Sequence, residues 1–169
     1  ERGGRVALIV TETPANPTNS LVDLRLMREA SDWLGREQGE PRPPVTVDNT
    51  FLGPVFQRPL EHGADLVMYS LTKYIGGHSD LVAGGIVGSK ELVKPVRLLR
   101  SATGSQLDPN TAWMIMRSME TLSLRMHRGV AELFAADRTS RWPPARRAAT
   151  AAPPRLPAPV GPPCLPTRD

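Results

Sequence analysis

Two polar positions that follow short apolar runs stand out in this chain of 169 residues. Asp48 ends the run VTV, and Lys73 comes shortly after the run LVMY. Two residues with small hydroxyl side chains, Ser70 and Thr72, precede the lysine. A lysine can form a Schiff base, a carboxylate can hold a protonated pyridine nitrogen, and hydroxyls can bind phosphate oxygens. These residue types are the ones that a protein needs to hold pyridoxal phosphate (PLP).

Each of these residues also has an ordinary structural interpretation. A lysine at the start of a helix is commonly a surface residue, and a lysine that reacts must lose its proton in a desolvated or cationic setting. Ser70 and Thr72 could cap a helix, and Asp48 lies in the turn-like stretch DNT, where it could be an N-cap. The combination of all four side chains favours the cofactor interpretation.

The sequence contains one further candidate for the cofactor site and two patterns that could indicate a different site. Asn16 lies between two prolines, where it could contact the cofactor's phenolate oxygen or a substrate carboxylate, or could simply shape a turn. The stretch SLTK at residues 70–73 matches the Ser-x-x-Lys pattern of acyl-enzymes, but the companion motifs Lys-Thr-Gly and Ser-Asp-Asn are missing. His78 has no second His, Cys or carboxylate at ligand spacing, so we predict no metal site.

The predicted elements alternate between strands and helices. Short apolar runs predict strands at residues 6–10, 45–47, 66–69 and 81–88. Helical spacing of apolar residues predicts helices over residues 21–37, 90–99 and 109–134. This alternation predicts an α/β layer with a mostly parallel sheet flanked by helices. Because ligands bind beyond the carboxyl ends of such strands, we expect Asn16, Asp48 and Lys73 to meet at one edge.

The character of the chain changes near residue 137. Residues 138–169 contain nine of the 18 prolines and six arginines, for a net charge of +5, which leaves −1 for residues 1–137. Such a segment cannot form a helix interior or a central strand, so we expect a disordered or aberrant tail over residues 137–169. Residues 1–136 are then the folded part. Because the basic charge belongs to the tail, no nucleic-acid partner is predicted.

Cysteine content and hydropathy indicate the cellular location that we expect for the protein. The single cysteine, Cys164, fits a reducing compartment, and a cytoplasmic location is the default. No apolar run approaches the roughly 20 residues that span a bilayer, so no membrane partner is predicted. The chain begins almost directly on a strand-like run without Met, so we interpret it as an internal fragment of a longer protein.

Four motifs in order resemble those of one enzyme family. They are TETPANPT at residues 11–18, VDNTF at 47–51 with QRPL at 57–60 and GAD at 63–65, SLTKY through GHSD at 70–80, and ETLSLRM at 120–126. This set resembles the Cys/Met-metabolism, or trans-sulfuration, PLP enzymes: cystathionine γ-synthase, cystathionine γ-lyase, cystathionine β-lyase and methionine γ-lyase. The resemblance covers residues 5–129.

The resemblance implies a fold and a set of roles. The fold is the aspartate-aminotransferase-like PLP fold type I, with this chain forming part of the large domain. Lys73 is implied as the Schiff-base lysine, Asp48 as the partner of the pyridine nitrogen, Ser70 and Thr72 as phosphate ligands, and Asn16 as a contact to the cofactor or to the substrate carboxylate. The implied reaction is β- or γ-elimination or γ-replacement on an amino acid such as cystathionine, methionine or O-acyl-homoserine.

The resemblance also implies parts that this sequence does not show. In the family, an upstream segment supplies a Tyr-x-Arg phosphate clamp from the neighbouring subunit, and a downstream domain binds the substrate carboxylate. The full-length parent is therefore expected to be a homo-oligomer, a dimer of dimers. Two interpretations stay open: part of an active PLP-dependent lyase or transferase, or a non-catalytic truncated remnant that binds PLP weakly or not at all.

Overall fold

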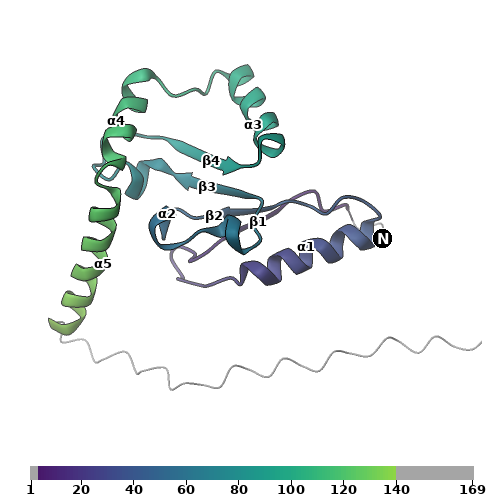
Figure 1. Ribbon diagram of the computed structural model, residues 1–169, viewed down its shortest axis with the longest axis horizontal. Helices are drawn as coiled ribbons and strands as arrows, with labels where there is room; N and C mark the ends of the chain where they lie inside the picture. Colours follow the sequence, from purple (N-terminus) through teal and green to yellow (C-terminus); the bar gives the residue numbers. More distant parts are fainter. Residues whose placement is uncertain (1–3, 140–169) are drawn as a thin grey trace, which may run out of the picture. The chain divides into compact units, whose positions relative to one another are not determined.

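The computed structural model describes residues 4–139, and side chains within residues 4–132. Four strands form one sheet in the order β1-β2-β3-β4 (Figure 1), and they are β1 (Ile9–Glu12), β2 (Val45–Asp48), β3 (Leu66–Ser70) and β4 (Gly84–Gly88). The first three strands are parallel, and β4 runs antiparallel to β3. The predicted mostly parallel sheet is therefore confirmed, with β1 and β4 starting three residues later than expected.

The central strand β2 is buried on both faces. Val45 and Val47 are fully shielded from solvent, and Thr46 between them is 3% exposed. Burial on both faces explains why these residues form a continuous β-branched run rather than an alternating pattern. Parallel pairing places Glu12, Asp48 and Met68 at matching positions on the three strands. The polar residues that follow these strands consequently start from one edge.

Helix α1 (Leu24–Gln38) runs along the sheet next to β2 (Figure 1). The Asp23 carboxylate caps its N-terminus by accepting from the Arg25 backbone N–H at 2.9 Å. Gly39 ends the helix in the left-handed conformation that favours glycine. Leu24 packs with Val45, Val47 and Ala64, and this cluster holds α1 against the sheet.

The other helices lie between and after the strands. They are α2 (Gly53–Phe56), a 3₁₀ helix (Pro59–His62), a π-helical turn (Leu71–Ile75), α3 (Lys90–Thr103), α4 (Pro109–Met119) and α5 (Leu122–Thr139). The single helix predicted over residues 109–134 was wrong, because the chain breaks between α4 and α5. The Ser118 carbonyl there accepts from the Thr121 hydroxyl at 3.3 Å and from Arg125 Nη2 at 2.8 Å. The Thr121 backbone N–H donates to the same carbonyl at 3.3 Å, so the chain forms a tight turn at this junction.

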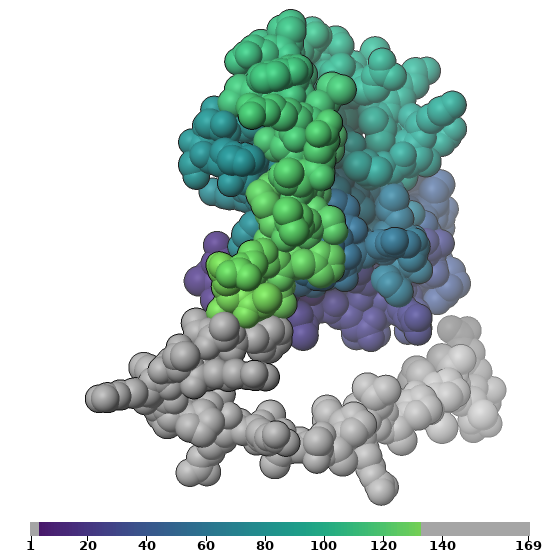
Figure 2. All heavy atoms as spheres, turned by 60° about the vertical axis from the view of Figure 1, so that its left-hand side comes forward, coloured from purple at the N-terminus to yellow at the C-terminus, as the bar shows by residue number. Residues whose placement is uncertain are grey.

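The break changes which side chains are buried. The helical spacing of the sequence predicts that Trp113, Met116 and Met119 share one face with Leu122 and Met126. Leu122 and Met126 are each 8% exposed, but Trp113, Met116 and Met119 lie on the surface. The residue that α4 buries is Ile115. Figure 2 shows the green atoms of α4 and of the start of α5 as a continuous ridge. An apolar stripe in the sequence was therefore divided between two helices with different buried faces.

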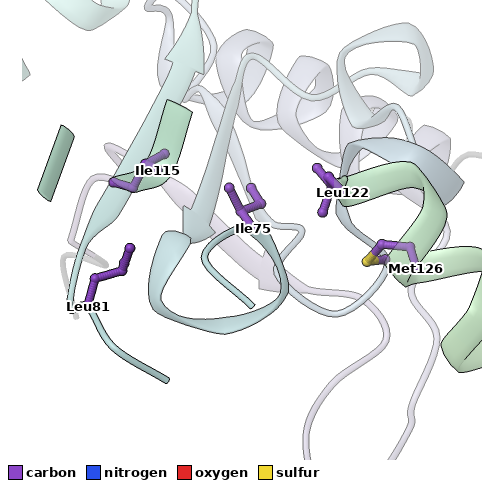
Figure 3. Packing of buried hydrophobic residues seen from close by; sticks show 5 residues of the cluster. All are labelled: Ile75, Leu81, Ile115, Leu122 and Met126. Atoms are coloured by element: carbon purple, nitrogen blue, oxygen red, sulfur yellow. The ribbon is translucent and has the colours of Figure 1, made fainter. Parts of the chain in front are cut away.

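A second hydrophobic cluster lies around the π-helical turn. Ile75 is at its centre (Figure 3), and the other buried members are Leu81, Ile115, Leu122 and Met126. Residues up to Val130 form one compact unit, which contains all four strands, and residues 131–139 complete α5. The predicted tail lies outside the described residues apart from residues 137–139, so its structure stays a prediction. Within the described part, no helix is both long and apolar enough to cross a membrane.

An ion pair joins the chain before β2 to the chain before β3. Two Arg42 nitrogens donate to the Asp65 carboxylate at 2.7 and 2.6 Å, and the Val45 backbone N–H donates to it at 2.8 Å. Burial by itself would raise the pKa of Asp65, because it disfavours the charged carboxylate. The hydrogen bonds from Arg42 and Val45 and the positive charges of Arg42 and Arg28 outweigh burial, so the pKa of Asp65 is lowered.

The lowered pKa of Asp65 predicts a loss of stability in acid. The contribution is complete above the unfolded pKa, about pH 4, and is lost as pH falls through the lower pKa of the folded state. Urea unfolding between pH 7 and pH 3 measures this effect. The difference in unfolding free energy between wild type and Asp65→Asn should shrink as pH falls below about 4. A difference that stays constant down to pH 3 would show that Asp65 is not the group responsible.

Candidate functional site

The five side chains predicted to bind the cofactor line one cavity of about 850 Å³. They are Asn16, Asp48, Ser70, Thr72 and Lys73. All of them lie at or just beyond the carboxyl ends of β1, β2 and β3. This is the edge at which open α/β sheets bind ligands. The expectation that the three strand ends deliver these residues to one place is met by the structure.

Lys73 lies in the π-helical turn that follows β3. Single π-helical turns are rare and occur frequently at functional sites. The backbone of Lys73 departs from helical geometry, with φ −84° and ψ −122°, so the turn changes direction at the lysine itself. Its side chain is exposed to the cavity rather than buried. Of the two nearby tyrosines, Tyr74 also lines the cavity, whereas the Tyr69 hydroxyl accepts from Asn49 Nδ2 at 3.2 Å.

Asp48 presents one carboxylate oxygen that is already used and one that is not. Its Oδ1 accepts from the Thr50 backbone N–H at 2.9 Å, which fixes the orientation of the carboxylate. Among the described residues no hydrogen bond reaches Oδ2, so that oxygen can accept from a ligand N–H. Thr50 in turn accepts from the Ser70 backbone N–H at 2.8 Å. The end of β2 is thereby fastened to the start of the Lys73 turn.

The hydroxyl groups of Thr72 and Ser70 differ in the hydrogen bonds that they already form. Thr72 Oγ1 donates to the Ala83 carbonyl at 3.2 Å and accepts from the Ala83 N–H at 2.9 Å. This pair of bonds joins the Lys73 turn to the chain just before β4. To donate to a phosphate oxygen, Thr72 would first have to release the Ala83 carbonyl. Within the described residues the Ser70 hydroxyl forms no hydrogen bond, so it can donate at once.

Asn16 lies in the loop that follows β1. The base of this loop is held by Thr13, which is 4% exposed and accepts from the Val22 backbone N–H at 3.0 Å. Asn16 itself is exposed and lines the cavity beside Asp48. Its amide can therefore face a ligand, while the loop beneath it is fixed by a buried hydrogen bond.

Sequence reasoning missed two charged residues of the same cavity. Glu12 ends β1 in register with Asp48, and Arg125 comes from α5. The criterion that selected Asp48, a carboxylate at the end of a strand, could have selected Glu12 as well. Arg125 stands in the motif ETLSLRM at residues 120–126, but no role was predicted for it, because α5 is brought to the cavity only by tertiary packing. An aromatic pair, Phe51 and Tyr74, also borders the cavity with ring centroids 6.3 Å apart.

The residues present fit PLP. Lys73 supplies the only lysine amine of the cavity within the described residues, and the oriented Asp48 carboxylate has an oxygen ready for a pyridinium N–H. The Ser70 hydroxyl is ready to donate to an anionic phosphate, and the cavity is within the size range of cofactor pockets, about 300–1,000 Å³. These contacts answer the three demands of the cofactor: a covalent partner, a ring partner and a phosphate partner.

Known proteins with similar sequences belong to one group. Over 119 residues the chain is 44% identical to cystathionine γ-lyase of Bacillus subtilis, which covers 70% of this chain and 30% of that protein. It is 45% identical over 123 residues to L-methionine γ-lyase of Pseudomonas putida, with coverages of 72% and 29%. The chain thus spans about three tenths of the length of these relatives.

Similarity in structure leads to the same group. The chain resembles CalE6, a methionine γ-lyase from Micromonospora echinospora, with a TM-score of 0.69 and 38% identity over 80% of this chain and 36% of that one. The predicted fold, part of a PLP fold type I large domain, is confirmed by this match. The sequence profile described as Cys/Met metabolism PLP-dependent enzyme matches residues 3–136. This chain therefore belongs to the family of Cys/Met metabolism PLP-dependent enzymes.

Proposed function

We propose that the cavity binds PLP through Lys73. We further propose that the parent protein, which contains this sequence, acts on sulfur- or oxygen-substituted amino acids. The observation that supports this most directly is the meeting of five side chains of suitable chemistry in one cavity. The activities of relatives, methionine γ-lyase, cystathionine γ-lyase and cystathionine γ-synthase, support a trans-sulfuration reaction. The substrate is then cystathionine, methionine or an O-acyl-homoserine, and the parent protein is a homo-oligomer.

Each proposed role follows from the chemistry of one side chain. The Lys73 amine attaches the cofactor covalently, and Asp48 Oδ2 accepts from the ring N–H. Ser70 and Thr72 bind the phosphate, and Asn16 binds the phenolate oxygen or the substrate carboxylate. When bound, PLP supplies an electron sink that labilises bonds at the α carbon of an amino acid.

Lys73 would have a second role once substrate has displaced it from the cofactor. Its free Nζ can accept the proton from the α carbon of the substrate and return a proton to a neighbouring carbon. The hydrogen bonds between Thr72 and Ala83 and between Thr50 and Ser70 hold the turn that carries Lys73. The amine would then work in the same cavity as the Asp48 carboxylate, which would stabilise a protonated ring nitrogen.

The function is tested with the purified 169-residue chain and PLP. We expect a near-visible absorption band, and borohydride reduction followed by peptide mapping should place the label on Lys73. Turnover of cystathionine and methionine is then assayed. A missing band, or label spread over all lysines, would contradict cofactor binding by this chain and would favour the non-catalytic alternative.

Replacing Asp48 by Asn is expected to separate cofactor binding from chemistry. The amide keeps the size of the side chain but no longer stabilises a protonated ring nitrogen. Covalent attachment of PLP should persist, whereas exchange of the substrate α proton with D₂O should slow about a hundredfold, as when one electrostatic stabiliser is removed. NMR of L-methionine in D₂O measures this exchange. Glu61→Gln, an exposed acid outside the cavity, is the control, and equal rates in all three proteins would refute the role of Asp48.

A further inference from the structure

The turn that carries Lys73 ends with two backbone carbonyls that are held by a distant side chain. Arg125 Nη1 donates to the Tyr74 carbonyl at 2.6 Å, and Arg125 Nη2 donates to the Ile75 carbonyl at 3.2 Å. Carbonyls at the end of a helical turn lack partners within the turn and need outside donors. A guanidinium group meets this need well because its N–H groups point in fixed directions in one plane.

The same guanidinium also holds the junction between α4 and α5. Arg125 Nη2 donates to the Ser118 carbonyl at 2.8 Å, and Nε donates to Thr121 Oγ1 at 3.0 Å. One side chain thus forms four hydrogen bonds, two to the Lys73 turn and two to a junction about 50 residues later in the sequence. An arginine has five N–H donors, so most of its capacity is used here.

Packing on both sides of Arg125 fixes its distance from the turn. Leu122 and Met126, one turn before and one residue after it on α5, pack against Ile75 in the same cluster (Figure 3). The bend after the turn is shaped to receive the guanidinium, because Gly77 has a φ of +75° and a Cβ at that position would overlap Arg125 Nη1. Ile75 is only 7% exposed, so the end of the turn has little freedom to move away.

We propose that Arg125 is the positioning residue for Lys73: its guanidinium fixes the end of the π-helical turn and thereby the place from which Nζ enters the cavity. This inference rests on the proposed function for the importance of Lys73. The hydrogen bonds between Arg125 and the turn hold independently of that function. Thr72 fastens one side of the turn through Ala83, and Arg125 fastens the other side, so that the lysine lies between two fixed points.

Hydrogen exchange tests the proposal on the full chain without cofactor. The amides of Gly76 and Gly77 donate to the carbonyls of Leu71 and Lys73, each at 2.7 Å, and report on the turn. In Arg125→Lys and Arg125→Ala their exchange should accelerate at least about tenfold, because the lost bonds involve a charged donor. The sheet amides of Val47 and Val67 should change far less.

Arg42→Ala is the control, because it removes an arginine that binds a carboxylate away from the cavity. It should lower the melting temperature without selectively accelerating exchange at Gly76 and Gly77. Unchanged exchange at these two glycines in Arg125→Lys, which keeps the positive charge and is the milder substitution, would overturn the proposal. If Arg125→Ala fails to fold, Arg125→Lys alone decides.

A second measurement connects the turn to chemistry. The rate at which borohydride-fixed PLP accumulates on Lys73 should fall about tenfold or more in Arg125→Lys and stay near the wild-type rate in Arg42→Ala. Equal labelling rates in Arg125→Lys and wild type would overturn the positioning role even if exchange changed. If wild type takes up no label, the proposed function of this chain fails, and the exchange result still decides whether Arg125 holds the turn.

Discussion

Replacing Lys73 with alanine is expected to abolish covalent attachment of PLP to this chain. The sequence contains only two other lysines, Lys90 and Lys94, and both lie on α3 away from the cavity lining. An amine outside the cavity has neither the Asp48 carboxylate nor the Ser70 hydroxyl to hold the ring and the phosphate. Borohydride reduction and mass mapping should therefore find no label in Lys73→Ala at PLP concentrations that label wild type completely.

The two lysines of α3 give matched controls for this experiment. Lys90→Ala and Lys94→Ala each remove one primary amine, as Lys73→Ala does, but leave the cavity intact. Both variants should be labelled on Lys73 to the wild-type extent. If Lys73→Ala retained stoichiometric label on α3, the cavity would not be the cofactor site, and the convergence of the five side chains would have another explanation.

The edge at which the site lies could be predicted from the sequence because strand ends carry their own signal. Asp48 follows a fully buried β-branched run, and a parallel sheet forces the ends of such runs to one side. Lys73 and Asn16 were placed by the same reasoning. Local patterns were sufficient here because a short connection after a strand cannot carry its first residues far from that strand.

The features that the sequence did not reveal depend on contacts between distant segments. The break between α4 and α5 arises where Arg125 and Thr121 bind the Ser118 carbonyl, and no helix-ending residue marks it. For the same reason the apolar residues of the predicted helix 109–134 were assigned to one face. Periodicity describes a single straight helix, and it fails when a side-chain hydrogen bond redirects the chain.

Replacing Asp65 with alanine is expected to cost about 3 kcal/mol of unfolding free energy, as for breaking a largely buried ion pair. The Asp65 side chain is 14% exposed, and its loss leaves the Arg42 guanidinium and the Val45 N–H without their acceptor. Val45 is fully buried, so water cannot easily replace that bond. Urea denaturation followed by circular dichroism should show a midpoint lowered by roughly 1 M or more.

The loss of unfolding free energy should depend on how deeply the ion pair is buried. A second, exposed ion pair in the chain provides the comparison. Glu61 pairs with Arg58 at 3.3 Å, but both side chains are more than 60% exposed. Because water and salt screen such a pair, Glu61→Ala should cost less than about 1 kcal/mol. Asp65→Asn should lie between the two, since the amide oxygen can still accept from Val45. Equal losses for Asp65→Ala and Glu61→Ala would mean that burial does not strengthen the Arg42–Asp65 pair, and the connection between the chain before β2 and the chain before β3 would then depend on the hydrophobic clusters alone.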